Sequence, residues 1–328
     1  MIEVINPSHD PYFNLALEEY LVKSWTGPKN LFVLWQNQPA VIIGRNQNAI
    51  EEVNLPYLEQ EGIALVRRMS GGGAVYHDSG NLNYTLVLDD SQDFANFDKF
   101  TRPVIKALKK IGVKAENSGR NDITIKGLKF SGNAQFKYRG RLLHHGTILF
   151  DSNLDIMTQV LNPGEHKIAS KGIKSVRSRV TNICEHLSQD LTVEEFKEIL
   201  ARELLHLEPG SGTCELAPSD LQAVEALREN KYATWAWNYG HSPAFNLRKT
   251  ASLAWGHIDI RLEVKHGRIG ACRIFGDYFP SGEIEDLEGA LIGVSYRLED
   301  IKACLEEVGL LGYLPQIDAN ELARLICG

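Results

Sequence analysis

The chain has 328 residues, of which 43% are hydrophobic, and its formal net charge is −7. That length leaves room for one large domain and a smaller one, and the acidic balance argues against nucleic acid as a partner. The polar N-terminus predicts no signal peptide, and no apolar run approaches the ~20 residues that span a bilayer. We therefore expect a cytoplasmic enzyme or binding protein without a membrane partner.

The five cysteines are odd in number and form no C-x-x-C pair. This pattern argues against a disulfide framework or a zinc site and favours a reducing compartment. The cysteines are Cys184, Cys214, Cys272, Cys304 and Cys327.

The first sixty residues predict two helices and a pair of strands. Asp10 is expected to cap a helix that begins with Pro11. The runs LFVLW (residues 31–35) and AVIIG (residues 40–44) are short, rich in branched residues and bounded by Pro and Gly. They predict two buried strands that pair with each other. A short helix is expected over residues 56–61.

A glycine turn follows in the segment VRRMSGGGAVYHDSGNLNYT (residues 66–85). A strand carrying Arg67 and Arg68 should lead into it, and strands over 73–77 and 82–88 should then be joined by a turn at 78–81. The three consecutive glycines lack Cβ atoms, so their N–H groups can surround an anion. The two arginines add guanidinium groups suited to phosphate or carboxylate.

A strained hairpin turn flanked by solvated arginines explains the same residues about as well. The segment is not a Walker loop, because no Gly-Lys-Ser/Thr follows. It is not a dinucleotide fingerprint either, because the glycines enter a strand and not a helix. Anion binding is therefore predicted only in combination with other groups.

The middle of the chain predicts the fold class. Helical spacing over residues 97–111 ends at Gly112, and short strands are expected near 122–125, 129–135 and 142–150. Strands in hairpin order, interleaved with a few helices, predict an α+β fold and not a βαβ repeat.

Polar residues accompany these strands. Asn121 and Asp122 precede one of them, where an aspartate can hold a metal ion or orient a lysine. Lys129 precedes FSGNAQ, interpreted as a tight turn that presents the ammonium group to developing phosphoryl charge, although an exposed strand-edge lysine is commoner. His144 and His145 should point to opposite faces of their strand, and core histidines are a simpler reading than a metal site.

The segment NPGEHKIASKGIKSVRSRV (residues 162–180) is rich in Gly, Ser and cations. It predicts a long mobile loop. The loop is either a solvated charge run or a lid over an anionic intermediate. Its cations include Lys167, Lys171, Lys174, Arg177 and Arg179.

The rest of the chain predicts further helices and one hairpin. Thr192 and Glu195 form a capping box, and another helix should begin near Ser219 with Gln222 at its third position. Alternation over residues 252–278 predicts a hairpin turning at residues 266–267. Helices over 300–308 and 318–326 finish the chain. The boundary region 246–250 gives domains of residues 1–246 and 247–328.

The blocks RRMSGGGAVYHDSGNLNYT, GRNDITIKGLKFSGNAQ, HHGTILF and KGIKSVRSRVTNI follow one another in this chain. In this order, and with WNYGHSPAF, the chain resembles the lipoate-protein ligase family over most of residues 1–250. The C-terminal portion is similar to the family's accessory domain. The resemblance implies a large α+β catalytic domain with mixed or antiparallel sheets flanked by helices, like biotin protein ligase and class II synthetases, plus a small α+β C-terminal domain.

The resemblance also implies a two-step reaction. Lipoate and ATP with Mg²⁺ give lipoyl-adenylate and pyrophosphate, and a lysine of an acceptor lipoyl domain then takes the lipoyl group while AMP leaves. The implied acceptors are E2 subunits of 2-oxoacid dehydrogenases and the glycine cleavage H protein. A monomer is expected.

Site residues are implied position by position, with Lys129 as the essential lysine that touches both nucleotide and lipoate. The implied ATP-binding residues are Arg68, Gly73, Ala74, Val75, Tyr76, Asn121, Asp122 and Lys129, with Asp122 also the candidate Mg²⁺ ligand. The implied lipoate-binding residues are Arg68, Gly71, Gly72, His77, Lys129 and His145. Strand alternation separately predicts that residues 41–43 and 76–77 line an apolar slot for the lipoate tail. The implied adenylate loop carries Lys171, Ser175 and Arg177.

Three alternatives stay open. An ATP-independent octanoyl or lipoyl transferase of the same fold would use a cysteine as acyl carrier, and the nearest one, Cys184, is interpreted as a buried structural thiol. A biotin ligase would carry a basic Gly-Arg-rich loop, which the sequence lacks. A non-catalytic lipoate-binding protein would keep the apolar slot and lose the nucleotide site.

Overall fold

The structure is a computed structural model that describes residues 1–47, 49–89, 93–119, 121–161, 179–206, 212–239, 247–265 and 267–327. The chain divides into two compact units. The first contains Met1–Ile43, Ala49–Met69 and Ala74–Asn238, and the second contains Gly44–Asn48, Ser70–Gly73 and Tyr239–Gly328.

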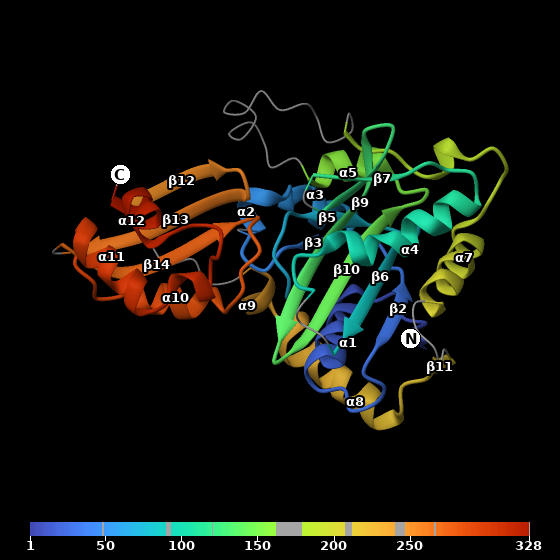
Figure 1. Cartoon of the computed structure of the whole chain (residues 1–328), viewed down its shortest axis with the longest axis horizontal. Helices are drawn as coiled ribbons and strands as arrows, with labels where there is room; N and C mark the ends of the chain where they lie inside the picture. The colour runs from blue at the N-terminus through green and yellow to red at the C-terminus, as the bar shows by residue number, and fades with distance from the viewer. Residues whose placement is uncertain are drawn as a thin grey trace. The chain divides into compact units, whose positions relative to one another are not determined.

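Helices and strands alternate irregularly along both units (Figure 1), which confirms the predicted α+β class. The elements of the first unit are β1 (Ile2–Val4), α1 (Pro11–Lys23), β2 (Leu31–Trp35), β3 (Ala40–Ile43), α2 (Ala49–Glu52), α3 (Leu55–Glu61), β4 (Ala64–Arg67), β5 (Val75–His77), β6 (Asn81–Leu88), α4 (Phe97–Lys110), β7 (Glu116–Ser118), β8 (Asp122–Ile125), β9 (Leu128–Tyr138), β10 (Arg141–Leu149), α5 (Leu154–Val160), α7 (Val193–Leu205), β11 (Gly212–Cys214), α8 (Pro218–Leu227) and α9 (Trp235–Asn238).

The first unit is built on a sheet of eight strands in the order β11-β1-β2-β6-β10-β9-β8-β7. Its central strands β2, β6, β10 and β9 are antiparallel neighbours. A separate sheet has the order β4-β3-β5, with β3 parallel to β4 and antiparallel to β5. The large sheet fixes the side chains of the candidate site described below.

Two predicted pairings are wrong. The strands β2 and β3 are both buried, as predicted, but they lie in different sheets, because β3 takes β4 as its parallel partner through the crossover of α2 and α3. The strands β5 and β6 are joined by the predicted turn but also belong to different sheets. In both cases the chain changes sheet at the turn, which a local hairpin pattern does not reveal.

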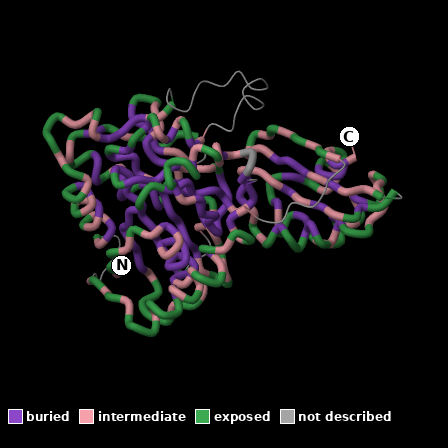
Figure 2. Tube along the Cα trace, turned by 180° about the vertical axis from the view of Figure 1, so that it is seen from behind, coloured by how far each residue is buried: buried purple, intermediate pink, exposed green. Residues whose placement is uncertain are grey.

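Helices cover both faces of the large sheet. Figure 1 shows α4 crossing one face with α1 behind the strands. The apolar side of α1 packs on residues of β2, β6 and β10 such as Val33, Val87 and Leu143. On the other face Phe100 of α4 lies 4.9 Å from the ring of His144, centroid to centroid. The central strands are therefore buried on both sides, as the purple trace in Figure 2 shows.

The local signals at helix ends are mostly confirmed. Asp10 accepts a hydrogen bond from the Tyr12 N–H at the start of α1, and Thr192 and Glu195 form the capping box of α7. The helix predicted near Ser219 begins one residue earlier, as α8, because Pro218 takes its first position. Asp220, and not Gln222, occupies its third position.

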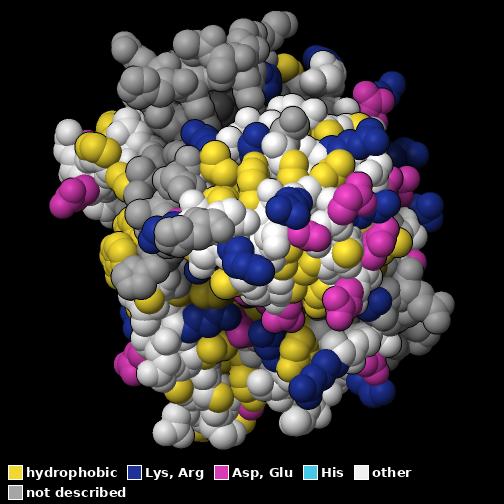
Figure 3. Space-filling view, turned by 90° about the vertical axis from the view of Figure 1, so that its left-hand side faces the viewer, with side chains coloured by type: hydrophobic (Ala, Val, Ile, Leu, Met, Phe, Trp, Pro, Cys, Tyr) yellow, Lys and Arg dark blue, Asp and Glu magenta, His cyan; other side chains and the backbone are white. Residues whose placement is uncertain are grey.

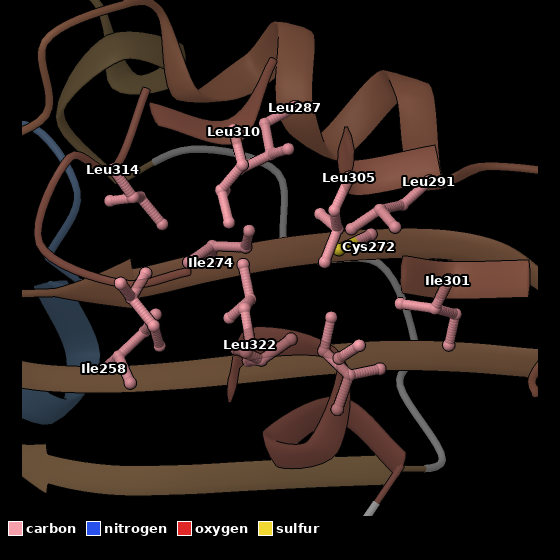
Figure 4. Packing of buried hydrophobic residues seen from close by; sticks show 14 of the residues in the cluster. Ile258, Cys272, Ile274, Leu287, Leu291, Ile301, Leu305, Leu310, Leu314 and Leu322 are labelled. Atoms are coloured by element: carbon pink, nitrogen blue, oxygen red, sulfur yellow. The ribbon is translucent and has the colours of Figure 1, made fainter. Parts of the chain in front are cut away.

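The second unit has an antiparallel sheet in the order β12-β13-β14, formed by β12 (Leu247–Leu253), β13 (Gly256–Lys265) and β14 (Arg268–Gly276). The strands β13 and β14 form the predicted hairpin. Its helices are α10 (Ile284–Leu291), which was not predicted, α11 (Leu298–Glu307) and α12 (Ala319–Cys327). Figure 4 shows that Ile258 and Ile274 of the sheet pack with Leu287 and Leu305 of the helices in one core.

Two loops that are distant in sequence also belong to the second unit. The Gly276 N–H donates to the carbonyl oxygen of Asn46 at 2.8 Å. Arg45 pairs with Glu283 at 2.6 Å and with Glu285 at 3.2 Å. Residues 45 and 46 are therefore held at the end of β14 and the start of α10, and the Gly72 N–H donates to the Tyr278 carbonyl oxygen at 3.4 Å.

The surface in Figure 3 mixes both signs of charge. Lys and Arg alternate there with Asp and Glu among apolar side chains, so this face carries no broad basic patch. Among the described residues, no helix has the length and apolar character needed to cross a bilayer.

Candidate active site

A β-bulge aims the side chain of Lys129. The register between β8 and β9 shifts by one residue beside Lys129, and Phe130 is the extra residue, with its ring fully buried. Without a bulge, strand alternation would send the side chains of Lys129 and Gly132 to opposite faces. A bulge re-aims such a side chain, and here it brings the lysine over Gly132.

The ammonium group of Lys129 pairs with an aspartate and fits beside a glycine that leaves room for it. It pairs with the carboxylate of Asp122 at 2.8 Å, and both side chains are more than a third exposed. A Cβ atom on Gly132 would lie 2.8 Å from Lys129 Nζ, so the ammonium uses space that glycine leaves open. The predicted turn at FSGNAQ is wrong, because these residues continue β9. The rigid element that presents Lys129 is a bulged strand.

The strand register places this ammonium over a particular face of the large sheet. Ala134 of β9 lies opposite His145 of β10, which lies opposite Thr85 of β6. Gly132 is two residues before Ala134 on the same strand, so its Cβ direction points to the same face as these side chains. Lys129 and His145 therefore serve one face of the sheet.

A buried polar group occupies that face where α1 crosses it. Glu18 accepts a hydrogen bond from the Thr85 hydroxyl at 2.6 Å and lies 2.8 Å from His145 Nδ1. The indole N–H of Trp35 donates to the Thr85 hydroxyl at 2.9 Å. The side chains of Glu18, Thr85, His145 and Trp35 are all buried. The Glu18 carboxylate is therefore fixed on the same face of the sheet as the Lys129 ammonium.

Glu18 was missed by the sequence interpretation. It lies on the buried side of α1, three residues after Leu15 and four before Val22. A carboxylate on the apolar stripe of a helix needs a partner to be buried. That placement was the signal that could have singled out Glu18.

The two adjacent arginines have different roles. Arg67 donates to the carbonyl oxygens of Trp237 and Asn238 at 2.9 and 2.8 Å, and its own N–H donates to the Asn238 side chain. Arg67 therefore anchors α9, with its Nε and Nη2 atoms engaged by backbone carbonyl oxygens. Arg68 is also buried and donates to the carbonyl oxygen of Ile42 at 3.2 Å. Neither arginine is the solvated side chain that the alternative explanation required.

The pKa of Arg68 reports a strongly desolvated cation. Burial lowers the pKa to about 10, with Glu18 opposing the shift and Arg67 adding to it. A guanidinium with this pKa remains charged at neutral pH. Arg68 is thus a fixed positive charge near the buried carboxylate.

His77 lies beside Arg68. Its Nδ1 is 3.0 Å from the amide nitrogen of Asn37, and its ring meets Trp35 edge-on at 5.9 Å. Burial lowers the pKa of His77 to about 3, helped by the nearby charges of Arg68 and His145. His77 is therefore a neutral imidazole at physiological pH.

His144 points to the opposite face, as the strand geometry predicted. Its Nδ1 is 3.1 Å from the Gln135 amide nitrogen, and its ring packs against Phe97 and Phe100 of α4. Burial lowers its pKa well below the usual value. His144 is a satisfied core histidine.

The glycine turn packs on backbone within the second unit. A Cβ atom on Gly71 would collide with the carbonyl oxygen of Tyr278. Gly72 has φ +91° and donates its N–H to the same carbonyl at 3.4 Å. A Cβ atom on Gly73 would meet nothing within 4 Å. Ala74, Val75 and Tyr76 follow in the first unit, where Tyr76 is buried in β5.

Comparison with known proteins decides the family. Residues 10–205 match the model of the lipoyl protein ligase A/B catalytic domain, and residues 242–326 match that of the bacterial lipoate protein ligase C-terminus. Lipoate-protein ligase LplJ of Bacillus subtilis is 46% identical over 321 residues, covering 97% of each chain. This chain belongs to the lipoate-protein ligase family. It is an enzyme of that family, as its named relatives are.

Solved structures of the same family agree. LipL1 of P. falciparum in complex with lipoate has a TM-score of 0.80 at 25% identity and covers 99% of each chain. Lipoate-protein ligase A bound with ATP has a TM-score of 0.63 at 28% identity, covering 73% of this chain and 98% of the other. A bipartite ligase from Thermoplasma acidophilum, described with its E2 lipoyl domain, has a TM-score of 0.66 at 30% identity, covering 75% and 98%.

Asn121 forms hydrogen bonds with Asn133 on the neighbouring strand. Its amide nitrogen donates to the Asn133 carbonyl oxygen at 2.6 Å, and its own carbonyl accepts from the Asn133 N–H at 2.9 Å. The side chain therefore links the start of β8, which carries Asp122, to the middle of β9.

Cys184 differs from its prediction. It is half-exposed and not buried, and it lines an open pocket of about 670 Å³ with Asp151 and residues 187–192. Its thiol donates to the Asp151 carboxylate at 3.2 Å. Burial, the Asp151 hydrogen bond and nearby negative charge raise the pKa of the thiol to about 12. Such a thiol is a poor acyl carrier, because the thiolate is the nucleophile.

The predicted adenylate loop of the ligase family, with Lys171, Ser175 and Arg177, lies outside the described residues. The described residues that follow it, from residue 179 on, are bonded to the strand that carries Lys129. Val180 forms a bridge with Lys129, and the Thr181 N–H donates to the Lys129 carbonyl oxygen at 3.0 Å.

Proposed function

We propose that this ligase joins lipoate to a lysine of an acceptor lipoyl domain in two ATP-dependent steps. The observation that carries the proposal is the Lys129 ammonium, held over Gly132 by Asp122, on the sheet face that also carries His145. The lipoate-bound and ATP-bound relatives support the two substrates.

In the first step a carboxylate oxygen of lipoate attacks the α-phosphorus of ATP. The bond from that phosphorus to the oxygen bridging to the β-phosphate breaks, and pyrophosphate leaves with the bonding electrons. Two anions must approach each other, so cations that offset their repulsion and hold them in line lower the barrier. Lys129 supplies such a cation at the reacting groups, and the buried charge of Arg68 favours an anion nearby.

In the second step the neutral amine of the acceptor lysine attacks the acyl carbon of lipoyl-adenylate. The bond from the acyl carbon to the phosphate oxygen breaks, AMP leaves, and the amine loses a proton as the amide forms. The adenylate is already an activated acyl group, so no nucleophile from this chain is needed.

The remaining site assignments form part of the proposal. The nucleotide would be contacted by Gly73, Ala74, Val75, Tyr76, Asn121 and Asp122. Lipoate would be contacted by Gly71, Gly72, His77 and His145. Lys171, Ser175 and Arg177 would close over the adenylate. We also propose residues 1–246 as the catalytic domain and 247–328 as the accessory domain.

Asp122 is the group that would hold Mg²⁺. The described residues contain no cluster of three His, Cys, Asp or Glu that could bind a metal. Mg²⁺ at nucleotide sites uses one or two carboxylates together with waters and phosphates. The partly exposed carboxylate of Asp122 fits that requirement. When bound, the ion would neutralise phosphate charge.

The acceptors we propose are E2 subunits and the glycine cleavage H protein. We also propose that the ligase is a monomer. The E2 lipoyl domain described with the archaeal relative supports the first. All five cysteines are free thiols, which supports a reducing compartment such as the cytoplasm.

Lipoylation of a purified lipoyl domain tests this function. We expect a mass increase of the acceptor that requires lipoate, ATP and Mg²⁺ together, and that disappears when the acceptor lysine is replaced by arginine. Lipoyl transfer from a lipoyl-carrier protein without ATP would instead support the transferase alternative.

A further inference from the structure

A chain of three buried asparagines leads to His77 from the start of α1. Asn6 donates from its amide nitrogen to Asn14 Oδ1 at 2.8 Å. Asn14 donates from its amide nitrogen to Asn37 Oδ1 at 2.8 Å. The Asn37 amide nitrogen lies 3.0 Å from His77 Nδ1. Each of the four side chains is at least nine-tenths buried.

Backbone groups fix the direction of this chain. Asn6 Oδ1 accepts the backbone N–H of Ser8 at 3.1 Å, so its amide nitrogen faces Asn14. The Asn14 amide nitrogen faces the carbonyl oxygens of Ser8 and Gln36, each at 3.1 Å. Carbonyl oxygens accept and cannot donate, so that end of Asn14 must be its NH₂ group.

The direction decides which nitrogen of His77 carries the proton. The atom of Asn37 that faces the Asn14 NH₂ must be an acceptor, so it is Oδ1, and the Asn37 NH₂ faces His77. An amide NH₂ only donates, so His77 Nδ1 must accept. A neutral imidazole that accepts at Nδ1 carries its proton on Nε2.

The resulting Nε2–H has no partner. His77 Nε2 is buried and makes no hydrogen bond to any part of the chain that the structure describes. Buried donors are nearly always paired, so an orphan in a candidate site indicates a group that arrives with the ligand. The fixed charge of Arg68 and the ring of His145 lie close enough to depress the pKa of His77. An acceptor placed here would also feel the Arg68 cation, which favours a negatively charged oxygen.

We propose that Asn14 and Asn37 are positioning residues that hold His77 as the neutral Nε2–H tautomer, so that this N–H donates to a carboxyl-derived oxygen of the acyl substrate. The choice of an acyl substrate rests on the proposed function. The tautomer itself rests only on the contacts above. A second cation beside buried Arg68 would be costly to desolvate, whereas a neutral donor adds a directional hydrogen bond without further charge.

The first test reads the tautomer in the full chain without ligand. Long-range ¹H–¹⁵N spectra of histidine-labelled protein distinguish the two neutral tautomers and imidazolium, and loss of one signal in His77→Gln assigns it. We expect His77 to be protonated at Nε2 alone at pH 7. Protonation at Nδ1, or at both nitrogens, would overturn the proposal.

The second test adds lipoate and octanoate to separate samples. The two acids share a carboxylate and an alkyl chain and differ in the dithiolane ring. We expect the Nε2–H proton to shift downfield with both acids, because both offer the same oxygen. A shift with lipoate alone, or with neither acid, would overturn the assignment to an acyl oxygen.

The third test reverses the relay. Asn37→Asp presents an acceptor in place of the NH₂ group, so His77 should become protonated at Nδ1. We expect the KM for lipoate in lipoylation to rise about tenfold, as one lost hydrogen bond of ~1.4 kcal/mol implies, with the KM for ATP little changed. Gln36→Leu is the matched control, because Gln36 is also buried and adjacent to Asn37 but donates to the Ser79 carbonyl.

The outcomes distinguish a failure of the proposed His77 donor role from a failure of the proposed ligase function. An Asn37→Asp enzyme with an inverted tautomer and an unchanged KM for lipoate would overturn the proposed donor role. A wild-type protein with the expected tautomer but no ligase activity would refute the proposed function and leave the Asn14–Asn37 relay standing.

Discussion

The position of the Lys129 ammonium depends on a neighbouring residue that has no side chain. Lys129 Nζ lies 2.8 Å from the position that a Cβ atom of residue 132 would take, and the Asp122 carboxylate pairs with it there. The glycine of FSGNAQ was interpreted from sequence as part of a turn, since turns are the commonest reason for an isolated glycine. Its place in a strand, beside a bulge, reflects a contact between side chain and backbone that no local pattern encodes.

Gly132→Ala should therefore impair catalysis through Lys129. The added methyl must displace the ammonium, and displacement of a reacting group by about 1 Å costs about a hundredfold in rate. We expect that loss in the kcat of lipoate activation, with the melting temperature nearly unchanged. Gly289→Ala, where a Cβ atom would meet nothing within 4 Å, is the control. Equal activity of the two variants would contradict the positioning of Lys129 by Gly132.

Cys184 gives a second prediction for a single residue. Its raised pKa and its hydrogen bond to Asp151 leave almost no thiolate at neutral pH. Cys184→Ser should keep ATP-dependent lipoylation within about twofold of wild type, because acyl transfer in the proposed mechanism uses no cysteine. The comparison is Cys214→Ser, another half-exposed thiol. A selective loss of activity in Cys184→Ser would favour the acyl-carrier transferase.

At the scale of elements, helix ends could be predicted from sequence and strand partners could not. Asp10, Thr192 and Gly112 act within a few residues of their own helix ends, so their signals are local. Strands β2 and β3 show the opposite case, because both were recognised as buried strands while their partners lie far along the chain. The contacts of the candidate site could not be predicted for the same reason, since Glu18 reaches His145 only through the packing of α1 on the sheet.

The capping box of α7 gives a prediction about one element. Thr192 accepts from the Glu195 N–H, and Glu195 accepts from the Thr192 N–H. Thr192→Ala removes one half of this exchange and should lower the free energy of unfolding by about 1 kcal/mol. Thr192→Ser keeps the hydroxyl and should lie close to wild type in urea unfolding. Equal losses in both variants would mean that the cap contributes nothing.

At the scale of the whole molecule, the contacts of the glycine turn and the asparagine relay depend on residues that are far apart in the sequence. Gly71 and Gly72 were assigned to lipoate and Gly73 to ATP from sequence, and in this structure Gly71 and Gly72 pack on Tyr278 within the second unit. The family resemblance, the α+β class and Lys129 could all be obtained from motifs. The relay from Asn6 to His77 could not, because four residues from separate segments meet only in the folded chain.

The second unit should respond to pH through Glu288. Burial raises the pKa of this carboxyl to about 7, although the Ile274 N–H and Arg273 oppose the shift. The folded state then binds the proton more tightly than the unfolded chain, so the stabilisation is full below about pH 4.5 and is lost as pH rises to about 7.

Glu288→Gln should remove this dependence. Between pH 5 and 8 we expect wild type to lose on the order of 2 kcal/mol more stability than the variant. The comparison is thermal unfolding of the full chain, with the exposed Glu299→Gln as the control that keeps the wild-type slope. Parallel pH profiles for wild type and Glu288→Gln would show that Glu288 is not the responsible group.

The central claim is that this chain itself forms the acyl-adenylate. Its most direct test is ATP–pyrophosphate exchange by the purified protein without any acceptor, run in parallel with lipoate, octanoate and biotin. The account predicts exchange with lipoate, weaker exchange with octanoate and none with biotin. Absence of exchange with lipoate, in protein that is folded and binds ATP, would contradict it.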